Sequence, residues 1–215
     1  MRLNGGEATI LFEDAAVVVC VKPRGVLSAA DASGSCAMAE LLSPRTVYPI
    51  HRLDRETTGL MVFAKTREAA AALSAALADG FCKEYLALCE TTPMPPQGEM
   101  HDLLYHDRRK NKTYVVKRKR NGVRSAGLRY RVLGDGFVLV RLYTGRTHQI
   151  RVQFASRGCP LKGDRRYGAK TDGELGLWAY RLTFRHPDGR EMTFTLPENF
   201  LPAAFSACKS DEIVL

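Results

Sequence analysis

Short apolar runs separated by turn residues recur along this chain, and they limit the folds open to it more than any other feature. The first run, "AAVVVCVKP", is rich in β-branched residues and ends at Lys22, before a turn at Gly25. This pattern predicts a buried strand of about six residues. A second run, "GLMVFA", lies between Thr58 and Lys65 and predicts another short strand.

One segment has the pattern of a helix. "REAAAALSAALADG" is rich in alanine, places Leu73 and Leu77 four residues apart, and offers Gly80 as a stop. "FCKEYLALCE" follows as a strand, and two further strand-like pieces flank a hairpin turn at Asp188-Gly189. The sequence shows no internal repeat and no long linker. This mixture predicts an α+β fold rather than a regular βαβ series.

The charge balance favours a polyanionic partner. The 215 residues include 32 Lys and Arg against 23 Asp and Glu. The resulting formal charge of +9 would attract RNA, DNA or an acidic membrane.

The 45% hydrophobic content is enough for one compact domain, or one catalytic domain in two lobes. No apolar run reaches the roughly 18 residues that span a bilayer. With scattered cysteines and no signal-like start, we expect a cytoplasmic protein with reduced thiols.

Basic residues are concentrated between residues 108 and 131. The segment "RRKNKTYVVKRKRNGVRSAGLRYR" interleaves them with Tyr and Val, which predicts a solvent-facing β-ribbon. We take four consecutive residues in it as candidate RNA contacts: Lys117, Arg118, Lys119 and Arg120.

Three short clusters place charged or polar groups beside apolar runs. The first, "HRLD" followed by "TTG", sets Asp54 in a loop between two predicted strands, where an arginine neighbour could keep the carboxylate ionised in a cleft. The plainer alternative is an aspartate that caps a turn. The second, "TGRTHQIR", brings Arg146, His148 and Arg151 to the start of an amphipathic helix predicted over residues 148–156, which suits phosphate or carboxylate recognition or a solvated basic face.

The third cluster is Lys83-Glu84-Tyr85, in the strand after the predicted helix. A tyrosine there is either core packing or a stacking partner for a nucleobase. Metal binding is not expected, because His148 has no second ligand at zinc-like spacing and the pair of His101 and His106 has no cysteine beside it.

Three motifs occur together: "HRLDRETTGLMVFAK", "KEYLA" and "GRTHQIRVQFASRGCPLKGDRRYG". In this order they resemble the signature regions of the RluA-type pseudouridine synthases, and with "VVVCVKPRGVLS" the resemblance covers roughly residues 11–196. It implies the pseudouridine synthase fold, a mixed and mostly antiparallel sheet in two halves with a catalytic cleft across its middle. It also implies isomerisation of uridine in structured ribosomal or transfer RNA, with the target base flipped out and no cofactor.

The resemblance assigns roles residue by residue. It makes Asp54 the catalytic aspartate, Tyr85 the active-site tyrosine, and Arg151 the ion-pair partner of the aspartate. Arg52 matches the arginine that fills the space left by the flipped uridine. The remaining substrate contacts that we expect are His51, Thr58, Arg146 and His148.

The chain departs from the family pattern at a few positions. Thr58 replaces the usual serine, Gln153 stands where histidine is common, and "SAGLRYRV" lacks the usual threonine two residues before its tyrosine. These departures bear on substrate contacts more than on chemistry.

We expect one catalytic domain over residues 1–215, without a separate N-terminal RNA-binding module, acting as a monomer.

Two rival functions use the same features. A catalytically silent RNA-binding protein would need only the basic surface, and keeping Asp54, Tyr85 and Arg151 argues against it. A metal-dependent nuclease would need clustered carboxylates, which a lone Asp54 among arginines does not provide.

Overall fold

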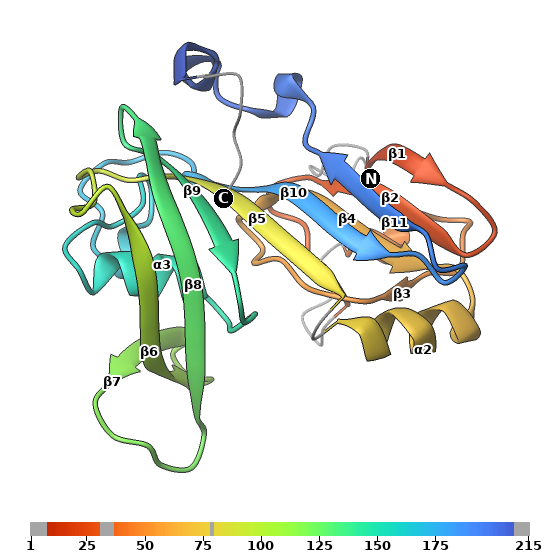
Figure 1. The fold of residues 1–215 in the computed structure, drawn as a ribbon, viewed down its shortest axis with the longest axis horizontal. Coiled ribbons are helices and arrows are strands. Elements are labelled where there is room, and N and C mark those ends of the chain that lie inside the picture. The colour runs from red at the N-terminus through yellow and green to blue at the C-terminus, as the bar shows by residue number, and fades with distance from the viewer. Residues whose placement is uncertain (1–7, 31–36, 78–79, 209–215) are drawn as a thin grey trace. The chain divides into compact units, whose positions relative to one another are not determined.

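The computed structural model describes residues 8–30, 37–77 and 80–208 (Figure 1). Its chain divides into two compact units. Unit 1 comprises Met1–Lys83 and Trp178–Phe200, and unit 2 comprises Glu84–Leu177 and Leu201–Leu215. Two strands cross the division along the chain, β5 (Phe81–Leu88) and β10 (Leu177–Arg185). Most strand pairs are antiparallel and helices are few, which confirms the α+β class.

Unit 1 is built on a sheet in the order β1-β2-β4-β10, extended by β11 beside β10. Its strands are β1 (Thr9–Glu13), β2 (Val17–Lys22), β3 (Tyr48–Pro49), β4 (Thr58–Ala64) and β11 (Glu191–Thr195). β3 pairs with β4, and β10 pairs with β4 in parallel. All six residues of β2 are buried, as its β-branched run predicts for a central strand. The hairpin expected at Asp188-Gly189 joins β10 to β11 and is confirmed.

Two helices belong to unit 1. α2 (Arg67–Ala76) packs against β3 and β4 and buries Ala69 and Leu73. It begins at Thr66, whose side chain accepts a hydrogen bond from the Ala69 N–H at 3.1 Å. The helix predicted from the alanine-rich segment is therefore confirmed, although it ends at Ala76 and not at Gly80. α1 (Met38–Leu41) is a single turn.

Unit 2 contains an antiparallel sheet in the order β9-β8-β6-β7. The strands are β6 (Gln97–Asp107), β7 (Lys112–Val116), β8 (Val123–Gly134) and β9 (Phe137–Leu142). α3 (Gln149–Ala155) packs against β6 and β7, and Val152 joins Leu104 and Ala126 in its buried core. The β-ribbon predicted between residues 108 and 131 is β7 with the first half of β8, joined by an exposed turn.

Candidate active site

Asp54 lies in the loop that joins β3 to β4 in unit 1, as the sequence predicts. Its side chain is half-buried, whereas that of Arg52 is exposed. The Thr57 N–H donates to the Asp54 carbonyl at 3.0 Å and closes a turn directly after the aspartate. β4 then runs through Gly59, whose φ is +126°, and a Cβ there would overlap the backbone of Ala179 on β10. Only glycine allows the two strands to approach so closely, so the end of the loop has a fixed position.

Ser28 holds the residue that precedes Asp54. Its Oγ accepts a hydrogen bond from the Leu53 N–H and donates one to the Leu53 carbonyl, both at 2.9 Å. Ser28 and Leu53 are both buried, so these backbone groups have no access to water. Because an unpaired buried backbone group is costly, one hydroxyl fixes the peptide groups on both sides of Leu53.

Lys22, the last residue of β2, holds the other side of the loop. It is fully buried, and its Nζ donates three hydrogen bonds, to the carbonyl oxygens of Pro23 (2.9 Å), Val26 (2.8 Å) and Arg55 (3.0 Å). Burial lowers the pKa of Lys22 to about 8, and the negative charges of Glu56 and Asp54 oppose this decrease. The ammonium group therefore places a positive charge beneath the Asp54 loop.

His51 and Thr58 also bond within unit 1. The buried His51 accepts a hydrogen bond at Nε2 from the Val62 N–H, at 3.2 Å. Burial lowers the pKa of His51 to about 3, so the ring is neutral at neutral pH. The Thr58 hydroxyl donates to the Lys22 carbonyl at 2.8 Å. These contacts hold the loop in place, and the expected contacts of both residues with RNA stay predictions.

Arg151 on α3 forms a buried ion pair in unit 2. Its Nε and Nη2 donate to the two carboxylate oxygens of Asp164 at 2.7 and 2.8 Å, and both side chains are almost fully buried. The guanidinium also lies over the Tyr167 ring, 5.2 Å from its centroid. This two-pronged geometry is the strongest form of the arginine–carboxylate pair. The ion pair predicted between Arg151 and Asp54 joins residues of different units and stays a prediction.

His148 precedes α3 and is part of a hydrogen-bonded chain. The Tyr167 hydroxyl accepts from the Thr113 N–H at 2.7 Å and lies 2.9 Å from His148 Nδ1. Because the hydroxyl oxygen already accepts from Thr113, it can donate its own proton to His148. The chain links the start of α3 to β7 and to the 3₁₀ turn Arg165–Tyr167.

The remaining predicted site residues of unit 2 lie on separate elements. Tyr85 is buried on β5, with 7% of its surface exposed. Arg146 is exposed in the turn before α3, where its Nε donates to the Ser125 carbonyl at 3.0 Å. Gln153, which departs from the family pattern, is fully buried and donates to the Asp102 carboxylate at 2.7 Å. Its amide nitrogen therefore has a partner within unit 2.

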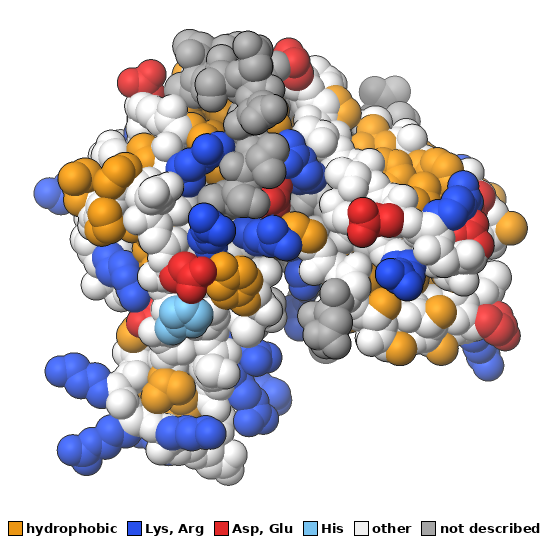
Figure 2. Space-filling view, in the orientation of Figure 1, with side chains coloured by type: hydrophobic (Ala, Val, Ile, Leu, Met, Phe, Trp, Pro, Cys, Tyr) orange, Lys and Arg blue, Asp and Glu red, His pale blue; other side chains and the backbone are white. Residues whose placement is uncertain are grey.

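The four basic candidates lie in the exposed segment between β7 and β8, and all four are exposed: Lys117, Arg118, Lys119 and Arg120. Arg120 lies over the Tyr105 ring, 5.0 Å from its centroid. Figure 2 shows blue Lys and Arg side chains gathered over this end of unit 2. The predicted solvent-facing ribbon is confirmed, and its charges are free to meet a polyanion.

No helix within residues 8–30, 37–77 and 80–208 is long and apolar enough to cross a membrane. Those same ranges hold no group of three or more His, Cys, Asp or Glu side chains arranged for a metal ion.

The sequence matches known proteins over most of its length. The family model described as RNA pseudouridylate synthase matches residues 16–156. The dual-specificity RNA pseudouridine synthase RluA of Escherichia coli (strain K12) is 30% identical over 204 residues, which cover 89% of this chain and 93% of that protein. The chain belongs to the RNA pseudouridylate synthase family.

Other members of the family extend this comparison. The uncharacterized RNA pseudouridine synthase YhcT of Bacillus subtilis (strain 168) is 32% identical over 201 residues. That match covers 85% of this chain but 65% of YhcT, so the chain spans less than two thirds of that relative's length. The solved structure of human RNA Pseudouridylate Synthase Domain Containing 1 has a TM-score of 0.78 and 22% identity, over 94% of this chain and 87% of that one. This likeness shows that the pseudouridylate synthase fold is shared.

Sequence reasoning missed three residues that hold the family's motifs in place: Ser28, Lys22 and Asp164. Lys22 and Ser28 lie in "VKPRGVLS" and Asp164 in "KGDRRYG", both within the region of resemblance. The signal was present as a lysine at the end of a fully apolar strand and as a single acid among basic residues. Neither signal identifies the distant partner, because Arg55 lies 33 residues from Lys22 and Arg151 lies 13 residues from Asp164.

Proposed function

We propose that this chain isomerises uridine to pseudouridine in structured RNA, with Asp54 as the catalytic carboxylate. The observation that carries the proposal is the fixed, half-buried loop around Asp54 in a chain that belongs to the RNA pseudouridylate synthase family. Ser28 and Lys22 hold the backbone on both sides of this aspartate. An enzyme needs its reactive group held in the productive geometry, and such buried support provides it.

The reaction breaks the bond between N1 of uracil and C1′ of ribose, turns the detached base, and joins C5 to C1′. The proton on C5 leaves, and N1 gains a proton, so the product is an isomer and no oxidant or reductant is consumed. Two routes are open to Asp54: attack as a nucleophile, or removal of the C2′ proton to give a glycal. Both require the carboxylate form of Asp54.

The other site residues take supporting roles in this proposal. Tyr85 stacks on the uracil and removes the C5 proton in the last step. Arg151 pairs with Asp54 as the family resemblance implies, while its bond to Asp164 fixes its position. Arg52, exposed beside Asp54, fills the space that the flipped uridine leaves. His51, Thr58, Arg146 and His148 are the further expected contacts, and the reaction needs neither metal nor cofactor.

The proposal also covers the class of RNA that is modified and the cellular compartment. The relatives include a dual-specificity RNA pseudouridine synthase and ribosomal large subunit pseudouridine synthase D of Neisseria meningitidis, which supports ribosomal or transfer RNA as the substrate class. Exposed basic residues between β7 and β8 supply the charge for RNA phosphates. Cys20, Cys82, Cys89 and Cys159 are free thiols, which fits the reducing cytoplasm, and we propose that the chain acts there as a monomer.

The test is release of tritium from RNA labelled at C5 of uridine, measured for the wild-type chain and for Asp54→Asn, which lacks the carboxylate. Asn keeps the shape of the side chain and removes its charge, so we expect at least about a thousandfold lower rate, with RNA binding retained. Arg67→Ala, on the exposed face of α2, is the matched control and should keep the wild-type rate.

Two results would overturn the proposal. No tritium release from bulk ribosomal and transfer RNA by the wild-type chain, despite tight RNA binding, would favour a silent RNA-binding protein. An undiminished rate in Asp54→Asn would remove this aspartate from the chemistry.

A further inference from the structure

A second feature of unit 2 is a pair of exposed rings on the face of the sheet opposite α3. His101 on β6 and Tyr143 just after β9 have ring centroids 6.3 Å apart and planes within 28° of parallel. Tyr143 is 46% exposed, and the His101 side chain is 66% exposed. Two nearly parallel exposed rings side by side form a surface on which a flat aromatic ligand can stack.

One carboxylate holds both rings. The Tyr143 hydroxyl donates to Glu99 Oε1 at 2.7 Å, and His101 Nε2 lies 3.0 Å from Glu99 Oε2. The hydrogen bond from His101 and then that from Tyr143 lower the pKa of Glu99, which keeps the carboxylate charged. The two rings are therefore arranged before any ligand arrives, and little conformational entropy is lost on binding.

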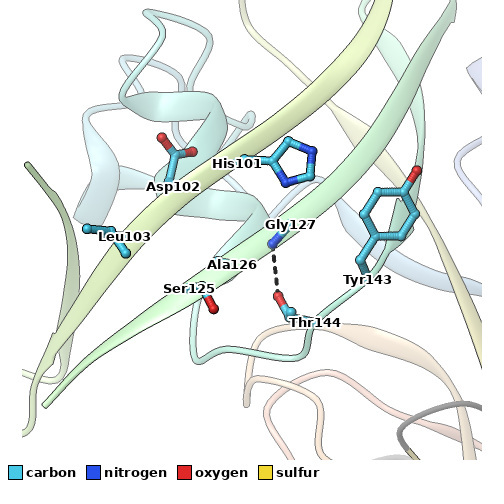
Figure 3. Close-up of a pocket in the computed structure, with 8 residues that line it drawn as sticks. All are labelled: His101, Asp102, Leu103, Ser125, Ala126, Gly127, Tyr143 and Thr144. Carbon is cyan, nitrogen blue, oxygen red and sulfur yellow. Dashed lines mark hydrogen bonds between the residues drawn. The ribbon is translucent and has the colours of Figure 1, made fainter. Parts of the chain in front are cut away.

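Gly127 on β8 lies between the rings, and its lack of a side chain leaves space for them over the sheet. β8 pairs His101 with Gly127, and the Gly127 carbonyl accepts from the Tyr143 N–H. A Cβ at residue 127 would lie 3.3 Å from His101 Nδ1 and 3.3 Å from Tyr143 Cδ2, tighter than ordinary packing. Figure 3 shows His101, Gly127 and Tyr143 on three neighbouring segments around one pocket. Glycine thus leaves room for both rings to lie over β8.

The rings border a shallow pocket of about 380 Å³, lined also by Ser125 and Thr144. This volume falls in the range of roughly 300–1,000 Å³ that is usual for small-ligand sites. The other side of β6 is occupied, because Asp102 bonds to Gln153 and Arg157 there. The pocket therefore opens on the solvent-facing side, because His101 and the other alternate residues of β6 point away from α3.

The charges around the rings indicate what the pocket accepts. Arg129 on β8 lies opposite Arg141 on β9 in the strand register. Arg129 also lies opposite Glu99 on β6. Arg146 reaches the edge of the pocket through its bond to the Ser125 carbonyl. Aromatic faces surrounded by guanidinium groups fit a base with its phosphates, because the rings stack on the base and the arginines meet the backbone.

We infer that His101 and Tyr143 form a stacking site in unit 2 for an unpaired base of RNA. This inference rests on the proposed function in that RNA is the ligand of the chain. The site would hold a single-stranded nucleotide of the substrate and so favour RNAs with an unpaired segment. Stacking accepts every base, so the site adds affinity without reading sequence.

The test is binding of a short fluorescent oligo-adenylate to the full chain, followed by anisotropy at low salt. Tyr143→Leu removes the ring and should weaken binding about tenfold, and His101→Leu should do the same. Tyr143→Phe keeps the ring and loses only the bond to Glu99, so we expect a change of less than about threefold. Tyr114→Leu, an exposed tyrosine on β7, is the matched control and should bind as the wild type does.

Three outcomes would overturn the inference: unchanged binding in Tyr143→Leu, equal losses in Tyr143→Phe and Tyr143→Leu, or an equal loss in Tyr114→Leu. Melting temperatures within about 2 °C of wild type would show that the variants are folded, as substitution at an exposed site should leave them. If Tyr143→Leu unfolds, His101→Leu, which removes the other exposed ring, replaces it with the same expected loss.

The same experiment separates this inference from the proposed function. Oligo-adenylate contains no uridine, so its binding does not depend on isomerisation. A chain that binds it through Tyr143 but releases no tritium from uridine-labelled RNA would overturn the proposed function alone. A chain that releases tritium normally, yet binds oligo-adenylate equally well with or without the Tyr143 ring, would overturn the inference alone.

Discussion

The loop around Asp54 and the basic segment between β7 and β8 hold their polar groups in different ways. In the loop, the Ser28 hydroxyl and the three N–H groups of the Lys22 ammonium all donate to backbone carbonyls, which restricts the movement of the aspartate. Between β7 and β8, Lys117 to Arg120 are exposed and adaptable. Bond breaking needs a group placed within a fraction of an ångström, whereas attraction of phosphates needs only nearby charge. The same chain thus uses burial for the first task and exposure for the second.

If buried contacts are what holds polar groups in place, breaking a buried ion pair should lower stability more than any other change. Arg151→Leu leaves Asp164, 2% exposed, without its counter-charge, and we expect unfolding free energy to fall by about 3–5 kcal/mol. Chemical denaturation would measure it. The matched control is Arg165→Leu, whose pair with Asp172 is exposed and should contribute less than about 1 kcal/mol.

Two double variants identify the carboxylate on which Arg151 depends. Arg151→Leu with Asp164→Leu should recover part of the lost stability, because no uncompensated buried charge remains. Arg151→Leu with Asp54→Leu should recover stability only if Asp54 is also a partner. Recovery in neither double variant would mean that the loss comes from packing against Tyr167 rather than from charge.

The next effect in size should come from Ser28→Ala, which tests whether the loop is fixed by its hydroxyl. The change removes both hydrogen bonds to Leu53 and leaves two buried backbone groups unpaired, a loss of about 1–3 kcal/mol. We expect the rate of isomerisation to fall while the RNA dissociation constant stays near its wild-type value. Ser74→Ala, on an exposed position of α2, should change neither. Equal losses of rate and affinity would show that the loop binds RNA rather than positions Asp54.

Arg52 combines features of both regions, because its side chain is exposed although it lies on the loop that holds Asp54. If it fills the gap of the flipped uridine, Arg52→Ala should slow modification of a stem-loop about tenfold and weaken equilibrium binding far less. Single-turnover rates and dissociation constants for one RNA give both quantities. A loss of affinity as large as the loss of rate would make Arg52 a phosphate contact like the residues between β7 and β8.

The smallest effect per residue should come from the exposed basic segment. Replacing Lys117, Arg118, Lys119 and Arg120 together with Gln should weaken RNA binding about tenfold and flatten the dependence of affinity on salt. Melting temperature should not change, since all four side chains are exposed. Lys117→Arg with Lys119→Arg keeps the charge and should keep the salt slope. An unchanged slope in the Gln variant would place the RNA elsewhere.

The sequence predicted the elements of this fold well where one local pattern decides them. The β-branched run of β2, the alanine-rich α2 and the Asp188-Gly189 hairpin each carry their own signal, and each lies where it was expected. Asp54 was placed correctly in a loop between strands, although its catalytic role came from family resemblance and not from spacing. The bounds of α2 were less accurate, because several residues near its end favour a helix and packing decides where it stops.

The sequence by itself determined which residues are basic, which runs form strands, and that Asp54 follows one strand and precedes another. Only the tertiary structure decided which groups meet. Ser28 bonds to Leu53 across 25 residues, and Arg151 bonds to Asp164 across 13. His101 meets Tyr143 because the register of β6, β8 and β9 places Gly127 between them. Strand register and loop packing depend on the free energy of the whole core, so no local pattern can specify these pairs.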